Sequence, residues 1–400
     1  MKTRIILVSV AVLVSVSAAV HATASPADEG GEGSQIWKLQ EPIDKANSKI
    51  DELLATNPGW LDYYAGSEAD VPNRRLQVNI KPDAPEVLYR ELADLGSGVT
   101  VSFAEADYSY NEMQSEALRL MQGGALTGVA LLSSGDGLKI TPSATGSGLA
   151  AKRASSADSP MIVEVEDAVT TDPAVATRQN DSSASPGWKG GARIKNGTGG
   201  CSTAFGATTS DGRVHLMTAY HCARGTGIKI TDGAGETIGT TFGTLPNRDV
   251  IRVSAARVAP RVYDGAWNNT AGYYKTVTGK TSNGSGTYVC SSGSYTGVNC
   301  NIKITDSTYI YALEGHPTIL ITGVRAEQQT SGAKAVGKGD SGGPVFKIVS
   351  GPSTNRLAAG VISGGQVTVS CGSTASSTCY KRILYQDITR ALNGSTLRIG

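Results

Sequence analysis

All six cysteines of this 400-residue chain lie in its second half (Cys201, Cys222, Cys290, Cys300, Cys371 and Cys379). The charge divides at a similar place. Residues 1–180 hold 14 Lys+Arg and 24 Asp+Glu, a balance of −10, whereas residues 181–400 hold 22 and 11, a balance of +11. Opposite net charges favour association of two bodies and speed their encounter. We therefore expect two parts, of which only the second is cross-linked, although two unrelated halves of different composition would give the same counts.

The first 24 residues have the pattern of an export signal. Lys2 and Arg4 precede an apolar run over 5–20, and Ala22-Thr23-Ala24 matches an A-x-A cleavage site. The run is shorter than the roughly 20 residues that a membrane span needs, and no other segment is apolar enough. The sequence predicts a secreted, extracellular protein with no membrane attachment once the signal is removed. In that oxidising setting six cysteines predict three disulfides. Because no C-x-x-C pair is present, we expect no metal site.

The rest of the first half alternates helical and strand patterns. Apolar residues recur at helical spacing over 36–54, and shorter helical patterns cover 85–95 and 110–121. Strands are predicted over 76–80, 99–103, 138–140 and 161–165. Residues 166–187 have the Asp, Thr, Pro, Ala and Ser content of an exposed linker. This half is expected to be a small α+β body.

The second half is rich in Gly, Ser and Thr. Short β-branched runs between Gly-rich turns are typical of an antiparallel sandwich or barrel. The predicted strands include 226–231, 250–253, 288–290, 302–305, 318–322 and 357–362, and one helix is predicted near 388–392. We expect this half to be all-β.

The segment Gly339-Asp340-Ser341-Gly342-Gly343-Pro344 is the sharpest chemical signal. Glycines beside a serine allow tight turns, and the amides of Gly339 and Ser341 are candidates for an oxyanion hole. The same residues match G-x-S-x-G, the nucleophile elbow of α/β-hydrolases. In that fold the histidine follows the serine, but all four histidines here precede Ser341, which argues against an esterase of that type.

His221, in Thr218-Ala219-Tyr220-His221-Cys222, is the favoured general base. His21 belongs to the predicted signal, His215 lies inside a strand pattern, and His316 stands in a turn by composition.

Asp249 is the preferred carboxylate to orient that base. It lies at the start of a β-branched strand, 28 residues after His221. Asp232, Glu236 and Asp264 lie in Gly-rich turns, where acidic side chains are usually solvated.

The order His221, Asp249, Ser341, with the two motifs around the histidine and the serine, resembles that of chymotrypsin-fold serine proteases. The segments 289–297 and 360–365 resemble the secreted bacterial branch of α-lytic protease and streptogrisin. The resemblance covers about residues 188–395, and residues 60–125 more weakly resemble the acidic pro-region of those enzymes. It implies two antiparallel six-stranded β-barrels with the triad between them. It also implies the disulfides Cys201–Cys222, Cys290–Cys300 and Cys371–Cys379, whereas the sequence alone allows 15 pairings.

The resemblance implies a secreted serine endopeptidase, made with a signal peptide (1–24), an acidic pro-region (25–180) and a protease domain (181–400). Ser341 would attack the peptide bond, His221 would move the proton, and Asp249 would hold the imidazole. No cofactor is expected. The expected partners are polypeptide substrates and the chain's own pro-region, which would assist folding and then inhibit, with no nucleic acid, in a monomer. The rival interpretation is an inactive member of the fold that acts as a binding protein.

By the same resemblance, the substrate pocket lies between Ala335, Val336 and Gly337 on one side and Ser363, Gly364 and Gly365 on the other. None of these is acidic, so a buried Lys or Arg of the substrate would lack a partner. We expect cleavage after apolar residues, and a broad pocket with little preference is the alternative.

Three departures from the family pattern stand out. Tyr220 replaces a small residue before the histidine, and no cysteine precedes the Ser341 motif. Ser291 stands where several relatives carry an arginine that pairs with the aspartate before the nucleophile. The sequence therefore leaves the partner of Asp340 open.

Overall fold

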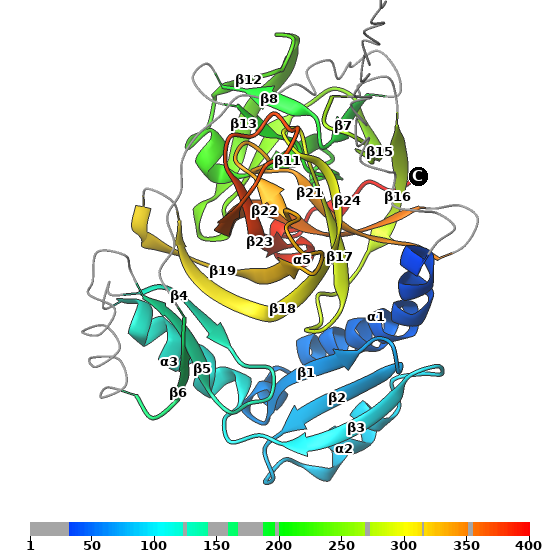
Figure 1. Ribbon diagram of the computed structural model, residues 1–400, viewed down its shortest axis with the longest axis vertical. Helices are drawn as coiled ribbons and strands as arrows, with labels where there is room; N and C mark the ends of the chain where they lie inside the picture. Colours follow the sequence, from blue (N-terminus) through cyan, green and yellow to red (C-terminus); the bar gives the residue numbers. More distant parts are fainter. Residues whose placement is uncertain are drawn as a thin grey trace, which may run out of the picture.

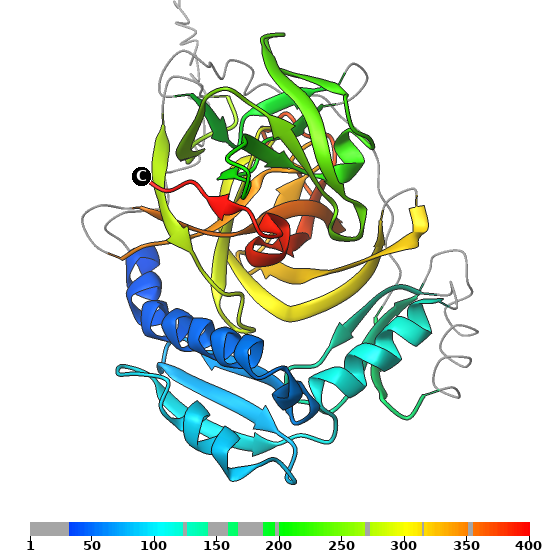
Figure 2. The same cartoon turned by 180° about the vertical axis from the view of Figure 1, so that it is seen from behind.

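The computed structural model describes residues 32–122, 126–142, 159–166, 187–196, 200–268, 273–313, 316–350 and 355–400. The predicted signal peptide and most of the predicted linker lie outside the described residues. The second half is an all-β body, and a small α+β part precedes it in the chain and packs against one side of it (Figures 1 and 2). Within the described residues no helix has both the length and the apolar character needed to cross a membrane.

The α+β part contains the predicted helices and strands, with ends that differ from the predictions by a few residues. Its helices are α1 (Glu32–Thr56), α2 (Glu86–Ala93), α3 (Tyr110–Gln122) and the 3₁₀ turn η1 (Pro58–Asp62). Its strands are β1 (Tyr64–Asp70), β2 (Arg75–Ile80), β3 (Thr100–Glu105), β4 (Leu126–Leu131), β5 (Leu138–Pro142) and β6 (Ile162–Val165). The sequence analysis missed β1 and β4.

Helix α1 lies between the sheet β1-β2-β3 and the all-β body in both views (Figures 1 and 2). Its apolar side packs on that sheet and on α2 through Ile43, Ala46, Ile50 and Leu54, which recur at helical spacing. Pro42 lies inside α1, where proline removes a backbone hydrogen bond and favours a bend. The helix visibly changes direction in Figure 2.

The strands of the second half belong to two sheets. The first has the order β24-β10-β11-β14-β13-β12-β8-β9. Its strands are β8 (Arg193–Lys195), β9 (Gly200–Ser202), β10 (Gly206–Thr208), β11 (Val214–Thr218), β12 (Lys229–Asp232), β13 (Thr237–Leu245), β14 (Val250–Ser254) and β24 (Thr396–Leu397).

The second sheet follows the path β20-β23-β19-β18-β17-β21-β22-β16-β15-β7. Its strands are β7 (Trp188–Gly190), β15 (Val258–Tyr263), β16 (Tyr274–Lys280), β17 (Tyr288–Gly293), β18 (Gly297–Leu313), β19 (His316–Gln328), β20 (Val336–Gly337), β21 (Pro344–Ile348), β22 (Arg356–Val369) and β23 (Cys379–Asp387). The predicted helix near 388–392 is α5 (Ile388–Leu392).

The short strands predicted over 302–305 and 318–322 are parts of much longer ones. Strands β18 and β19 have 17 and 13 residues and pair antiparallel in a long curved hairpin, drawn in yellow in Figure 1. Irregular register at several points along the pair interrupts the alternation of buried and exposed residues. That irregularity is why local sequence patterns show only fragments of these strands.

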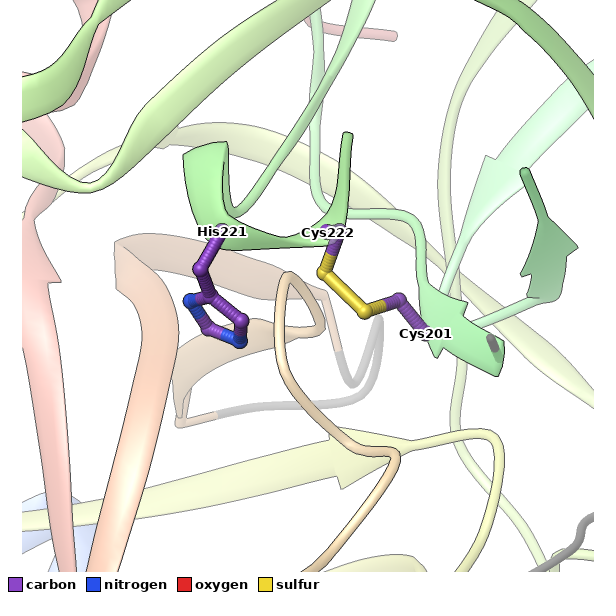
Figure 3. Close-up of side chains that lie close together, drawn as sticks. All are labelled: Cys201, His221 and Cys222. Carbon is purple, nitrogen blue, oxygen red and sulfur yellow. A yellow bond between two sulfur atoms is a disulfide. The ribbon is translucent and has the colours of Figure 1, made fainter. Parts of the chain in front are cut away.

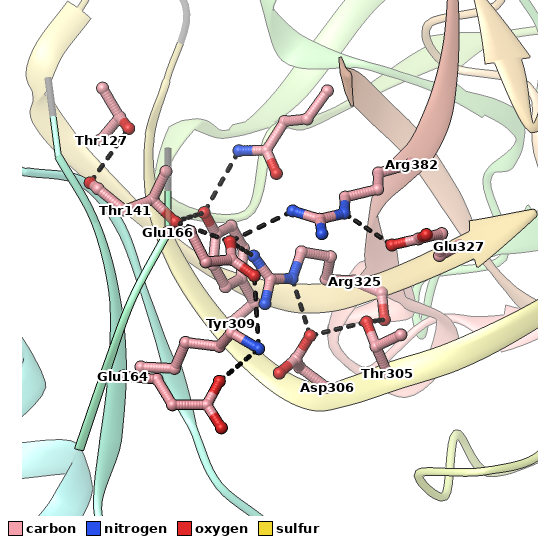
Figure 4. Close-up of polar contacts among 12 residues, drawn as sticks. Thr127, Thr141, Glu164, Glu166, Thr305, Asp306, Tyr309, Arg325, Glu327 and Arg382 are labelled. Carbon is pink, nitrogen blue, oxygen red and sulfur yellow. Dashed lines mark hydrogen bonds and ion pairs between the residues drawn. The ribbon is translucent and has the colours of Figure 1, made fainter. Parts of the chain in front are cut away.

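The α+β part adds strands to the second sheet. β4 pairs antiparallel with β18, with Val129 opposite Ile310, and β5 and β6 follow beyond it. Just after β6, the Glu166 carboxylate lies 2.5 Å from Arg325 and 3.2 Å from Arg382 (Figure 4). The prediction that the exposed linker begins at residue 166 is therefore wrong for Glu166, because two arginines of the all-β body hold it.

Candidate functional site

His221 and Asp249 are brought together by two neighbouring strands of the first sheet. β11 ends three residues before His221, and β14 begins immediately after Asp249. These strands pair antiparallel with Thr218 opposite Ile251, so the end of one lies beside the start of the other. His221 lies in the short turn η2 (Tyr220–Cys222), and Asp249 caps η3 (Pro246–Arg248) with φ +48°, a left-handed conformation that aspartate tolerates better than most residues.

The Asp249 carboxylate is buried and faces the histidine. His221 Nδ1 lies 3.0 and 2.8 Å from its two oxygens, and the His221 backbone N–H donates to Oδ1 at 3.0 Å. Because a carboxylate only accepts, the proton lies on Nδ1, and Nε2 is left as the basic nitrogen. The Ser363 hydroxyl, from β22 in the other sheet, donates to Asp249 Oδ2 at 2.5 Å. Both sheets therefore fix this carboxylate.

Ser341 lies in the turn before β21 and is held against the histidine side of the site. Its carbonyl oxygen accepts from Ser202 N–H at 2.8 Å and lies 3.8 Å from Cys222 Sγ. The next residue, Gly342, has φ +81°, and a Cβ there would lie 2.1 Å from Thr218 Oγ1 and 2.7 Å from Ala219 N. Only glycine permits this approach of the turn to the end of β11, and the approach brings the backbone of Ser341 to the turn that carries His221.

The turn leaves two amides available beside Ser341. Within the described residues, the N–H groups of Gly339 and Ser341 donate to no acceptor, whereas Asp340 N–H is bonded to Gly337 O at 3.0 Å. Gly339 has φ +95°, and a Cβ there would lie 2.5 Å from the buried ring of Tyr295. The position therefore requires glycine. Two unengaged amides at one turn can bind a developing oxyanion.

The partners of Asp340, which the sequence left open, come from two segments of the second half. Its buried carboxylate accepts four hydrogen bonds, and none comes from a cation. Oδ1 accepts from the backbone N–H groups of Tyr295 and Thr296 at 2.9 and 3.1 Å. Oδ2 accepts from the Thr296 hydroxyl at 2.5 Å and Gly337 N–H at 2.8 Å. Burial raises the pKa of Asp340, and these hydrogen bonds oppose the increase.

Two side chains that the sequence did not single out support the turn. Ser202 donates its hydroxyl to Gly339 O at 3.0 Å, in addition to its backbone bond to Ser341. Thr296 holds Asp340, as described above. The only sequence signal for Ser202 is its position beside Cys201, which is too weak to have identified it.

The residues predicted to line a substrate pocket differ in their surroundings. Ala335 and Val336 are buried, and a Cβ at Gly337 would lie 2.5 Å from Thr296 Cγ2. A Cβ at Gly365 would lie 2.4 Å from the Tyr380 ring, whereas Gly364 has open space. The hydroxyl of Ser363 points to Asp249, as described above, so its side chain helps to fix the carboxylate that faces His221.

Cys201 and Cys222 form a disulfide directly beside His221 (Figure 3). The other bridges join Cys290 to Cys300 and Cys371 to Cys379, so all three are the pairs that the resemblance implies. The sulfurs of Cys201 and Cys222 lie close to the His221 ring, but they are bonded to one another and His221 Nδ1 is bonded to Asp249. This group therefore lacks the thiolates of a metal site. A cavity of ≈ 330 Å³ borders His221 and this disulfide.

Tyr220, the unusual residue before the histidine, packs at the junction of the two parts. It lies against a buried cluster that includes Tyr309 and Tyr311 of β18 and Ala130 of β4. Tyr220, in the turn that carries His221, thus packs on a cluster to which both parts of the chain contribute.

Comparisons with family models and with curated proteins find no match. Among solved structures, the chain is similar to Thermobifida fusca protease A, with 28% identity and a TM-score of 0.40 over 53% of this chain and 98% of that one. It is also similar to a Nocardiopsis protease (27%, TM-score 0.37, 52% and 98%) and to Cellulomonas bogoriensis chymotrypsin (26%, TM-score 0.36, 53% and 98%). The neighbours are serine proteases, and this chain covers 98% of each of them.

Proposed function

We propose that the chain is the precursor of a secreted serine endopeptidase, with His221, Asp249 and Ser341 as its catalytic triad. The observation that carries the proposal is the buried Asp249 carboxylate, bonded to His221 Nδ1 from one sheet and Ser363 from the other, beside a serine turn with two unengaged amides. This is the set of groups that acyl transfer through a serine requires.

In the proposed reaction, His221 Nε2 removes the proton from Ser341 Oγ as that oxygen attacks the carbonyl carbon of the peptide. The amides of Gly339 and Ser341 donate to the resulting oxyanion. The imidazolium then protonates the leaving amine, which departs and leaves an acyl-enzyme. A water molecule then gives a proton to His221 and attacks the ester carbon. The bond to Ser341 Oγ breaks, the acid product leaves, and His221 returns the proton to the serine oxygen. Asp249 remains ionised throughout and stabilises the imidazolium.

We propose that the substrate residue before the cleaved bond is apolar. The buried pocket residues Ala335 and Val336 are apolar, and the nearest carboxylate in the sequence, Asp340, already accepts four hydrogen bonds from Tyr295, Thr296 and Gly337. It cannot turn to pair with a substrate Lys or Arg without leaving those donors unpaired. A set of chromogenic peptides that differ only in this residue tests the preference. The highest kcat/KM for an Arg peptide would contradict it.

The α+β part is proposed to be a pro-region that assists folding and blocks the enzyme until it is removed. Its support is the sheet shared by β4 and β18 and the opposite charge of the two halves. The disulfides are consistent with an extracellular enzyme.

The deciding experiment is titration of the processed protein with an irreversible serine-directed inhibitor. Labelling of one equivalent at Ser341, with loss of peptidase activity, supports the proposal, and Ser341→Ala is the control. A folded protein that takes up no label would instead favour the inactive binding protein of the same fold.

A further inference from the structure

Helix α1 presents a row of polar side chains towards the all-β body, directly beside its apolar face. Gln40, Asp44 and Asn47 recur at intervals of four and three residues, so they lie on one side of the helix. All three are at least 91% buried, whereas Lys45 and Glu41 of the same helix form an exposed ion pair. Buried polar groups cost free energy unless they are paired, so the partners of these side chains show which groups of the all-β body the helix recognises.

The carboxamide of Gln40 acts as a strand partner for β17. Its Oε1 accepts from Tyr288 N–H at 2.6 Å, and its Nε2 donates to Tyr288 O at 2.9 Å. Tyr288 lies two residues before Cys290, where the pairing of β17 with β21 begins. The two backbone groups of Tyr288 would be without a strand partner on this side, and the side chain of Gln40 supplies one.

Asp44, one helical turn further on, supplies the charge partner of Lys347. Asp44 Oδ1 lies 2.5 Å from Lys347 Nζ, and the lysine is 1% exposed. Within the described residues its other hydrogen bond is to Thr287 Oγ1 at 3.1 Å, which carries no charge. Lys347 lies in β21, the strand that follows the Ser341 turn. A cation buried in that strand therefore depends on a carboxylate from the α+β part.

We propose that the surface formed by the backbone of Tyr288 and the ammonium group of Lys347 is a recognition site for a helix that carries a carboxamide and a carboxylate four residues apart, as α1 does. The inference rests on the proposed function, in which the α+β part must stay bound after the chain is cut. The two contacts make that binding specific, because the carboxamide bonds to the backbone of Tyr288 and the carboxylate pairs with the buried ammonium group of Lys347. An apolar helix face would leave both unpaired.

The test uses the full chain with Ser341→Ala, so that it needs no protease activity. A cleavage site for an unrelated site-specific protease is placed between residues 170 and 182, and the folded protein is then cut. The rate at which the two pieces separate is measured by surface capture of one piece. Removing one partner of a buried charge pair acts mainly on dissociation, so Asp44→Asn is expected to separate at least about tenfold faster. Gln40→Met is expected to act in the same direction.

Glu52→Gln is the matched control, since Glu52 is an exposed carboxylate on the same helix. It is expected to leave the rate unchanged. Adding Lys347→Met to Asp44→Asn removes both charges and is expected to restore slow separation, because no buried cation is left unpaired. The proposal is overturned if Asp44→Asn separates no faster than Glu52→Gln, or if the double variant separates as fast as Asp44→Asn. Gln40→Met gives the answer if Asp44→Asn does not fold. Failure of inhibitor titration at Ser341 would refute the enzyme without changing these rates.

Discussion

At the scale of single residues, the site is organised by two buried carboxylates with different partners. Asp249 faces an imidazole that can become charged, whereas Asp340 is held by neutral donors alone. The first can therefore stabilise a proton that moves during a reaction. The second fixes the backbone of the turn that carries Ser341.

The first prediction concerns the triad. Ser341→Ala is expected to abolish peptidase activity, and His221→Ala nearly so. The members of a catalytic triad act as one unit, so the loss of either residue lowers the rate by several powers of ten. Purified variants are assayed with a peptide substrate after their folding is verified by circular dichroism. More than a few per cent of the parent activity in Ser341→Ala would contradict the assignment.

The second prediction concerns Asp340→Asn. The asparagine NH₂ group is a donor, and the four groups that surround this side chain are donors too. At least one of them would therefore face another donor and lose its hydrogen bond. We expect a loss of about 2–4 kcal/mol in the free energy of unfolding. We also expect a fall of about 100-fold in kcat, since the amide of Gly339 would no longer be held in place. Urea unfolding and kinetics measure the two effects, and Asp211→Asn, at an exposed turn of the same half, is the control.

The serine turn shows which features of the site can be predicted from the sequence and which cannot. The residue types of the triad are recognisable because their chemistry restricts them to few amino acids and a fixed order. The partners of Asp340 are mostly backbone amides of Tyr295, Thr296 and Gly337, and any residue type could supply those. Only the fold brings them to the carboxylate.

At the scale of secondary-structure elements, the pairing of β4 with β18 joins the two parts of the chain. Gly128 of β4 lies opposite Tyr311, and a Cβ at Gly128 would lie 1.9 Å from the Tyr309 hydroxyl. The strand can pair at this distance only because residue 128 has no side chain.

The third prediction follows from that contact. Gly128→Ala is expected to lower the yield of folded protein several-fold, because the new methyl group displaces Tyr309 or separates the strands. Adding Tyr309→Leu removes both the hydroxyl oxygen and the ring carbon Cζ, which would lie 2.3 Å from the new Cβ, and is expected to recover part of the yield, when compared with Tyr309→Leu alone. Gly59→Ala, where a Cβ meets no atom within 4 Å, is the control. Equal yields from Gly128→Ala and Gly59→Ala would show that this pairing does not limit folding.

The elements that the sequence missed share one property. β1 reads Tyr-Ala-Gly-Ser-Glu-Ala-Asp, with no β-branched residue, yet it pairs along β2 and is buried over its first half. β4 contains the glycine just described. In both strands the neighbouring strand decides the conformation, and local propensity does not. The helices α1, α2 and α3 were predictable because each buries one continuous side at helical spacing.

At the scale of the whole molecule, charge holds the two parts together at more than one place. Lys347 of the all-β body pairs with Asp44, and Arg325 and Arg382 pair with Glu166, near the two ends of the α+β part. Some of the opposite charges that the sequence shows in the two halves therefore form specific, buried ion pairs between the two parts. Their positions could not be predicted, because each joins residues more than 150 positions apart.

The last prediction is a pH dependence of the contact between the parts. Burial raises the pKa of Glu166, but the charges of Arg325, Arg382 and Lys139 and the hydrogen bond from Arg325 outweigh it, so the pKa lies below the usual 4.5. A carboxylate with a lowered pKa in the folded state contributes stability above its unfolded pKa, and that contribution is lost as the pH falls through the folded value.

In the full chain with Ser341→Ala, Glu166→Gln is therefore expected to lower Tm at pH 7, because it removes the charge that the two arginines face. The difference from the parent is expected to shrink steadily below about pH 4.5, where the parent carboxylate becomes neutral as well. Thermal unfolding between pH 3 and 7 measures both effects. Glu91→Gln, on the exposed side of α2, is the control, since its carboxylate lies 3.8 Å from an exposed arginine and far less is lost with it. A Tm difference for Glu166→Gln that stays constant down to pH 3 would mean that the side chain acts through packing, and that its charge does not hold the two parts together.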